Sequence, residues 1–129
     1  MDRLKVYKIL IVDDSALFKQ TFKEILQVRF PSIEIREATD GEKAIQEIKT
    51  SPPDIIFMDI NLPGENGLVL TQKIKARYPN IIIALLTGWD LPEYREASIR
   101  YKADYLLFKA SSAQEKIFGI VESVLPRRE

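Results

Sequence analysis

The chain has 129 residues, 46% of them apolar and 29% charged, with 19 basic residues matched by 19 acidic ones. This length suits one domain with a single buried core, while the neutral charge argues against nucleic-acid binding and the lack of a long apolar run argues against a membrane span. Because the sequence contains neither cysteine nor histidine, disulfides, thiolate nucleophiles and imidazole bases are excluded, and any chemistry must use carboxylates, hydroxyls and amines.

Apolar runs alternate with helical spacings along the first half of the chain. The run KILIV predicts a strand buried on both faces, and Ser15 or Asp14 would cap the helix that follows it. That helix has an apolar stripe formed by Phe18, Phe22, Ile25 and Leu26. The elements predicted for this half are strands at 8–12, 33–38 and 55–59, the capped helix, which stops at the FPS segment, and a short helix within 39–50.

The alternation continues after the Pro63-Gly64 turn. Pro92 suits the first turn of a helix, but the helix that it begins has the thinnest apolar stripe of the chain, formed by Tyr94, Ala97 and Tyr101. The last helix has a continuous stripe, formed by Ala113, Ile117, Ile120, Val121 and Val124. The elements predicted for this half are helices at 68–78, 92–102 and 113–124 and strands at 81–87 and 105–108.

This alternation of strands and helices predicts an α/β fold in which helices cover both faces of a parallel sheet. Right-handed crossover connections make such a sheet doubly wound. Five strands and five helices in this length fit a single flavodoxin-like domain with strand order 2-1-3-4-5 and a structured core from about residue 6 to residue 125. In this fold the reactive crevice lies beyond the carboxyl ends of the strands, near strands 1 and 3.

Side chains that can do chemistry stand at the ends of four of the five predicted strands. They are Asp13 and Asp14 after the first strand, Asp59 at the end of the third, Thr87 at the end of the fourth and Lys109 after the fifth. Each has an ordinary explanation by itself, such as a helix N-terminus, a turn or a surface lysine, but their coincidence favours a site. Three neighbouring carboxylates repel one another, and one lysine cannot neutralise them. Oxygen ligands suit Mg²⁺, which together with the lysine would attract an incoming anion.

Four segments that end predicted strands resemble the receiver domain of two-component response regulators: KILIVDDS, DIIFMDINLPGENG, ALLTG and YLLFK. They occur in the family's order, and the likeness covers essentially the whole chain. The resemblance implies a phosphorylation-activated signalling switch rather than an enzyme that turns over a separate substrate. It also implies a cytoplasmic protein that receives its phosphoryl group from a sensor histidine kinase or a phosphotransfer protein.

The family's pattern assigns roles to the acidic residues. Asp59 would accept the phosphoryl group, since its carboxylate is already ionised at neutral pH. Asp14 and Asp59 would bind Mg²⁺ directly, together with the backbone carbonyl of Asn61. Asp13 would bind the ion directly or through a water molecule.

The same pattern assigns Lys109 and Thr87 to the phosphoryl group itself. Lys109 would pair with one phosphoryl oxygen, and the Thr87 hydroxyl would move to bond another. This movement would rearrange the surface of the fourth strand, fourth helix and fifth strand, which contacts an output domain or a downstream protein. A homodimer through the fourth helix, fifth strand and fifth helix is a further expectation. Trp89 either overhangs the site and slows hydrolysis or is an ordinary exposed loop residue.

The chain departs from the family's pattern at three positions around the fifth strand. Many receivers have an aromatic residue three positions before the lysine, but here this residue is Leu106, with Tyr105 beside it on the opposite face of the strand. Proline commonly follows the lysine, and here the residue is Ala110. A glycine often precedes Ala103, and here the residue is Lys102. These departures bear on the switch and on local loops, and they leave the phosphorylation residues intact.

Other functions stay open at this stage. An aspartyl-phosphate hydrolase would use the same nucleophile and Mg²⁺, but it usually has a second aspartate two residues later, where this chain has Asn61. A flavodoxin-like binding module would need a Ser/Thr/Gly-rich phosphate loop, whereas DDSALF is acidic. A receiver that signals without phosphorylation is disfavoured because all five family positions are present. The chain also fits the receiver part of a longer DNA-binding transcriptional regulator, although these residues contain no output-domain pattern.

Overall fold

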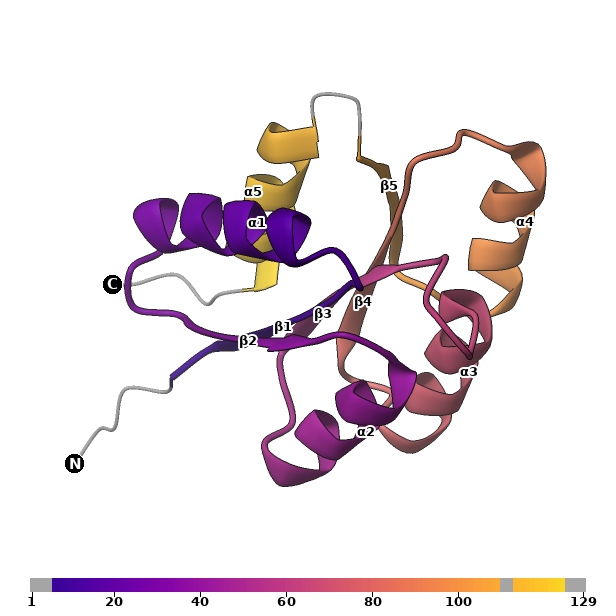
Figure 1. The fold of residues 1–129 in the computed structure, drawn as a ribbon, viewed down its shortest axis with the longest axis horizontal. Helices are drawn as coiled ribbons and strands as arrows, with labels where there is room; N and C mark the ends of the chain where they lie inside the picture. The colour runs from indigo at the N-terminus through magenta and orange to yellow at the C-terminus, as the bar shows by residue number, and fades with distance from the viewer. Residues whose placement is uncertain (1–5, 110–112, 125–129) are drawn as a thin grey trace.

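The computed structural model describes residues 6–109 and 113–124 (Figure 1). Five strands form one parallel sheet in the order β2-β1-β3-β4-β5, which confirms the predicted topology. The strands are β1 (Lys8–Val12), β2 (Glu34–Ala38), β3 (Ile55–Asp59), β4 (Ile82–Thr87) and β5 (Tyr105–Phe108). Because the chain winds outward in opposite directions from β1, the crevice of this sheet lies between the carboxyl ends of β1 and β3.

Five helices cover the sheet on both faces (Figure 1). They are α1 (Ala16–Arg29), α2 (Gly41–Thr50), α3 (Gly67–Arg77), α4 (Pro92–Arg100) and α5 (Ala113–Val124). The helices α1 and α5 pack on one face, and α2, α3 and α4 pack on the other. Within the described ranges, no helix is both long and apolar enough to span a bilayer.

The central strands place their side chains alternately in two hydrophobic clusters. In β1, Ile9 and Ile11 belong to the cluster under α1 and α5, whereas Leu10 and Val12 belong to the cluster under α2, α3 and α4. All five residues of β3 are buried. A strand covered on both faces needs apolar residues where it is buried, which is why ILIV in β1 and IIFM in β3 are continuous apolar runs.

Capping side chains fix where the helices α1 and α3 begin. Ser15 Oγ accepts a hydrogen bond from the Phe18 N–H at 3.1 Å, so Ser15, rather than Asp14, is the cap of α1. The side chain of Asn66 accepts the Leu68 N–H, and α3 therefore begins one residue earlier than predicted, at Gly67.

The helix α4 ends at Arg100, two residues before the predicted end. Lys102 has φ of 70°, a left-handed conformation that cannot continue a helix. Its N–H donates to the Ile99 carbonyl, and the next N–H, of Ala103, donates to the Ser98 carbonyl at 2.9 Å. These two bonds form a Schellman motif, whose left-handed position is usually glycine. The position at which the receiver domains that the sequence resembles often have glycine is thus a left-handed helix end.

Candidate functional site

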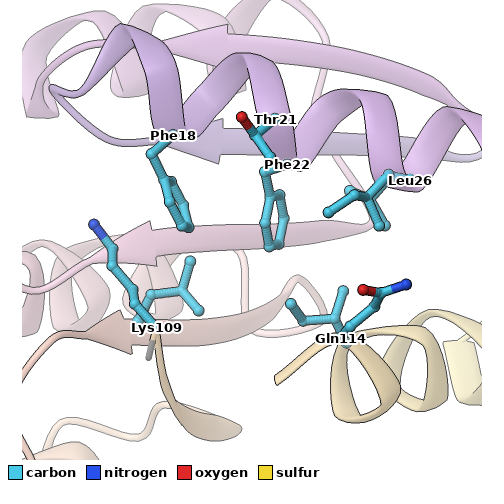
Figure 2. Close-up of a pocket in the computed structure, with 9 residues that line it drawn as sticks. Phe18, Thr21, Phe22, Leu26, Lys109 and Gln114 are labelled. Carbon is cyan, nitrogen blue, oxygen red and sulfur yellow. The ribbon is translucent and has the colours of Figure 1, made fainter. Parts of the chain in front are cut away.

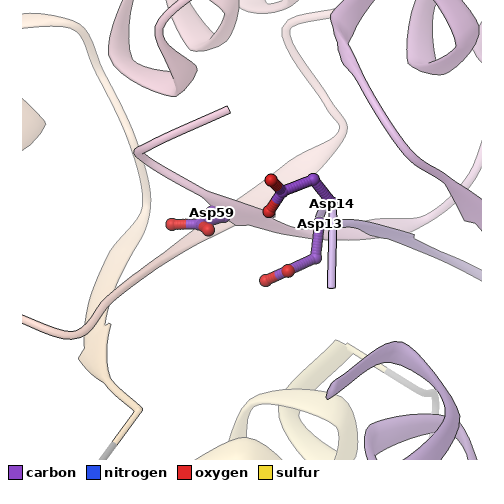
Figure 3. Close-up of side chains that lie close together, drawn as sticks. All are labelled: Asp13, Asp14 and Asp59. Atoms are coloured by element: carbon purple, nitrogen blue, oxygen red, sulfur yellow. The ribbon is translucent and has the colours of Figure 1, made fainter. Parts of the chain in front are cut away.

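Three carboxylates meet at the carboxyl ends of β1 and β3 (Figure 3). One oxygen from each of Asp13, Asp14 and Asp59 lies within 4.8 Å of the other two. Asp13 is fully buried and Asp59 is 7% exposed, whereas Asp14 is open to solvent. The strand ends therefore bring together the three acids that the sequence singled out, and they leave one of them accessible from outside.

Lys109 is the cation of this cluster. Its Nζ donates to Asp13 Oδ2 at 2.7 Å and to Asp59 Oδ2 at 3.3 Å, although 96 and 50 residues separate it from these partners. Its backbone N–H donates to the Thr87 carbonyl at 2.8 Å, which fixes where the side chain begins. Burial by itself lowers the pKa of Lys109, but the hydrogen bond and charge of Asp13, with a further contribution from Asp59, raise the pKa above the ordinary lysine value. The side chain is therefore a cation across the neutral range.

Thr87 is fully buried at the end of β4. Its Oγ accepts a hydrogen bond from the Trp89 N–H at 3.1 Å. The hydroxyl donates its proton to the Trp89 carbonyl at 3.4 Å, so it would have to exchange this acceptor to donate to a group on Asp59. Trp89 itself is 64% exposed, so the structure agrees with an exposed loop residue at this position.

The loop after β3 holds the backbone close to Asp59. The Asn61 N–H donates to Asp59 Oδ1 at 3.0 Å, and the Gly67 N–H donates to the Ile60 carbonyl at 2.8 Å. A Cβ atom on Gly67 would lie 2.3 Å from the carbonyl oxygen of Asp59. Only glycine therefore allows the N-terminus of α3 to approach the strand end so closely.

The donor set fits a hard divalent cation such as Mg²⁺. The second oxygen of Asp13, Oδ1, accepts the Ser15 N–H at 2.8 Å, so backbone groups and Lys109 orient both Asp13 and Asp59. Asp14 makes no hydrogen bond or ion pair with the part of the chain that the structure describes. Three acids facing one ammonium leave a local excess of negative charge, and oxygen ligands of this kind are what Mg²⁺ prefers.

Three contacts at the site were not predicted from the sequence. The Lys109 ammonium lies over the Phe18 ring, 4.2 Å from its centroid. The Tyr94 hydroxyl of α4 lies 3.5 Å from Asn61 Oδ1. Lys19 is buried, and its ammonium donates to Thr39 Oγ1 at 3.1 Å. The one available sequence signal was that Phe18 and Lys19 lie on the first turns of the helix that starts at the acids.

The side chains of β5 lie in different surroundings, and these show what replaces the aromatic residue that many receivers have three positions before the lysine. Leu106 is partly buried against the cluster under α2, α3 and α4, while Tyr105 is 40% exposed. Phe108, at the end of this strand, contacts α4, and its ring centroid lies 5.2 Å from the Arg95 guanidinium. Ala110, the other departure, lies outside the described residues.

Comparison with protein families gives a match to the response regulator receiver domain over residues 9–122. The chain is 33% identical over 118 residues to the oxygen regulatory protein NreC of Staphylococcus carnosus, covering 91% of this chain and 54% of the relative. It is 33% identical over 114 residues to the transcriptional regulatory protein DegU of Brevibacillus brevis, covering 88% and 48%. The chain thus spans about half the length of these curated relatives.

Solved structures share the fold over nearly the whole chain. A CheY-like receiver domain protein from Methanospirillum hungatei superposes with a TM-score of 0.84 at 24% identity, covering 93% of this chain and 94% of that one. The chemotaxis protein CheY4 of Vibrio cholerae superposes with a TM-score of 0.82 at 26% identity, covering 94% and 100%. The flavodoxin-like architecture predicted from the sequence is thereby confirmed.

Proposed function

The chain belongs to the response regulator receiver domains, the phosphorylation-controlled signalling modules of two-component systems, and on this premise we propose that Asp59 is its phosphoryl acceptor. The observation that carries the proposal is the Lys109 ammonium, which bonds the Asp59 carboxylate and the buried Asp13 at once. An anion arriving at Asp59 would therefore meet a cation that is already in place.

Asp13, Asp14 and Asp59, with the backbone carbonyl of Asn61, would hold Mg²⁺, which when bound neutralises charge on the phosphoryl oxygens. The Asp59 carboxylate attacks the phosphorus of a phosphohistidine on the donor protein, and an O–P bond forms while the P–N bond to the imidazole breaks. A carboxylate nucleophile needs no base from the chain. Lys109 pairs with a phosphoryl oxygen, and catalysis consists of positioning and charge neutralisation. Hydrolysis of the acyl phosphate by water resets the domain.

The switch would pass from Thr87 to the surface formed by β4, α4 and β5. The Thr87 hydroxyl would turn its proton from the Trp89 carbonyl to a phosphoryl oxygen, and the loop that joins β4 to α4 would move with it. The helix α4 suits such a movement because only Ala97 and Ser98 are buried among its residues. With Leu106 in place of an aromatic residue, the loop and α4 would carry the change.

The partners that we propose follow from the family. A sensor histidine kinase or a phosphotransfer protein would supply the phosphoryl group in the cytoplasm, and an output domain or a downstream protein would read the α4 surface. Ile99, which is 77% exposed, and Tyr105 would contribute to a homodimer through α4, β5 and α5. The domain would turn over no substrate other than its own acyl phosphate.

A second candidate function is that of the receiver part of a DNA-binding regulator. Relatives such as the transcriptional regulatory protein DegU are about twice as long as this chain, which leaves room in them for an output domain.

The test is phosphorylation by a small donor. Wild type, Asp59→Asn and Asp90→Asn are incubated with acetyl phosphate and Mg²⁺, and their intact masses are recorded at short intervals. Asp90 is an exposed carboxylate of the β4–α4 loop and serves as the matched control. We expect one phosphoryl group on wild type and on Asp90→Asn, dependent on Mg²⁺, and none on Asp59→Asn. An equal adduct on Asp59→Asn would contradict the assignment of Asp59, and no adduct on wild type would contradict the proposed function.

A further inference from the structure

We propose that Phe18 is a positioning residue whose ring holds the Lys109 ammonium in the orientation that phosphoryl transfer requires. The inference rests on the proposed function of the acidic cluster and adds a residue outside that cluster. Phe18 lies on the first turn of α1 and is half-buried. Figure 2 shows its ring beside the Lys109 side chain, at one end of a pocket between α1 and α5.

The contact between the two side chains has cation–π geometry. Lys109 Nζ lies over the Phe18 ring at 4.2 Å from its centroid, well inside the range of about 6 Å in which a ring attracts an ammonium group. The same nitrogen donates to Asp13 at 2.7 Å and to Asp59 at 3.3 Å. A lysine side chain is long and flexible, so a ring that attracts the ammonium restricts it to the conformation in which it also bonds the carboxylates.

The ring of Phe18 is itself held by a stack of aromatic residues. It stacks on Phe22 with centroids 5.4 Å apart, and Phe22 and Phe57 pack in a T-shaped arrangement with centroids 5.0 Å apart. Phe57 is a fully buried residue of β3, two positions before Asp59. The stack therefore ties the position of the ring to the strand that carries the phosphoryl acceptor.

A second set of contacts ties Phe18 to Asp13. Asp13 Oδ1 accepts the Ser15 N–H at 2.8 Å, and Ser15 Oγ accepts the Phe18 N–H at 3.1 Å. The Phe18 ring contacts the Lys109 ammonium, and this ammonium donates a hydrogen bond to Asp13 Oδ2 at 2.7 Å. These four contacts form a closed circuit in which the helix cap, the ring and the ammonium are positioned by the same carboxylate.

The circuit matters because the ring orients the ammonium without competing as a strong hydrogen-bond acceptor. An ammonium has three N–H donors, and its acceptors among the described residues are the carboxylates of Asp13 and Asp59. A phosphoryl oxygen on Asp59 can therefore take up a hydrogen bond while the ring keeps the nitrogen in place. Such preorganisation lowers the cost of reorienting the charge during the reaction.

The test compares phosphorylation rates in four variants and one double variant. Phe18→Leu removes the ring, Phe18→Tyr keeps it, and Phe118→Leu removes a half-buried ring of α5 that packs on Phe30 instead. Lys109→Met is made alone and combined with Phe18→Leu. The rate constant and the apparent donor affinity are measured with acetyl phosphate and saturating Mg²⁺, by intact mass and by the fluorescence of Trp89, the single tryptophan of the chain.

We expect Phe18→Leu to lower the rate constant by about fivefold, as the loss of one cation–π contact implies, without changing the apparent donor affinity. Phe18→Tyr restores the rate, and Phe118→Leu leaves it unchanged. In the Lys109→Met background, Phe18→Leu has no further effect, because its action runs through the lysine. A wild-type rate in Phe18→Leu, or an equal fall in both Lys109 backgrounds, would overturn the inference.

A second measurement does not depend on phosphorylation. A methylene group near the face of an aromatic ring is shifted upfield in proton NMR, so the ε-methylene of Lys109 is expected upfield of the other lysines. The shift should disappear in Phe18→Leu and persist in Phe18→Tyr. If wild type takes no phosphoryl group, the proposed function fails. The NMR shift then still shows whether the Phe18 ring lies against the Lys109 side chain. If the ε-methylene of Lys109 has an ordinary shift, the positioning role fails while the assignment of Asp59 stands.

Discussion

At the scale of single residues, Asp13 shows how the site keeps a charge inside the protein. The residue is fully buried, yet Oδ1 accepts the Ser15 N–H and Oδ2 accepts the Lys109 ammonium. A buried carboxylate is tolerated when it is paired and hydrogen-bonded. Because folding raises the pKa of Lys109, the stabilisation from this lysine is complete below the pKa of an unfolded lysine. It is lost only as the pH rises through the raised value.

Lys102 provides a prediction at the same scale, since its φ of 70° is a conformation that glycine adopts more easily. Lys102→Gly is expected to raise the free energy of unfolding by about 1 kcal/mol, the approximate cost of the left-handed conformation for a residue with a Cβ. Urea unfolding measures this change. The matched control is Lys116→Gly in α5, where the residue is helical and exposed, and where glycine should lower stability by about 1 kcal/mol. Destabilisation by both variants would contradict the prediction.

At the scale of elements, α4 is held less firmly than the other helices that cover its face. It buries Ala97 and Ser98, whereas α3 buries five residues. Its N-cap is Leu91, an apolar side chain that offers no oxygen to the free N–H groups of the first turn. Weak packing and a missing cap both lower the free energy of local opening, which is suitable for an element that changes position.

Leu91→Ser tests this interpretation of α4. Leu91 already has the extended backbone of an N-cap, with φ of −110° and ψ of 136°, so serine can accept a backbone N–H without rearrangement. We expect amide hydrogen exchange in α4 to slow by about fivefold, corresponding to a cap worth about 1 kcal/mol. Leu17→Ser, at an exposed position of α1 that is not a cap, should leave exchange in α4 unchanged. Equal exchange in Leu91→Ser and wild type would show that capping does not limit the stability of α4.

At the scale of the whole molecule, the sheet concentrates charge that the sequence distributes evenly. The chain is formally neutral, but the carboxyl ends of β1 and β3 gather three acids around one lysine. Such an arrangement costs free energy through repulsion between the acids. A bound divalent cation would remove much of this cost and would therefore stabilise the folded chain.

Mg²⁺ is accordingly expected to raise the melting temperature. At an ion concentration about tenfold above its dissociation constant, binding to the folded state alone stabilises by about 1.4 kcal/mol, which corresponds to a few degrees in a domain of this size. Asp14→Asn should lose the shift without unfolding, because Asp14 is exposed, and Asp90→Asn should keep it. Differential scanning calorimetry with and without a chelator measures the effect. A shift of the same size in Asp14→Asn would exclude Asp14 as a ligand.

Much of this architecture could be predicted from the sequence because burial imposes patterns on it. A strand covered on both faces is apolar along its length, so strands 8–12 and 55–59 were predicted with the bounds that the structure has. The carboxyl ends of parallel strands lie along one edge of the sheet, so the meeting of Asp13, Asp59 and Lys109 followed from their positions alone. Their chemical roles remain predictions.

Other features were decided only by the tertiary structure. The left-handed Lys102 ends α4 early, and Ser15 rather than Asp14 caps α1. The Phe18 ring lies against Lys109 although 91 residues separate them along the chain (109 − 18 = 91). A pattern of apolar and polar residues reports which face of an element is buried, but it carries no information on backbone angles or on which distant side chain lies opposite. Backbone angles and contacts between distant side chains depend on how the helices pack on the sheet. The position of the Lys109 ammonium at the site depends on such contacts.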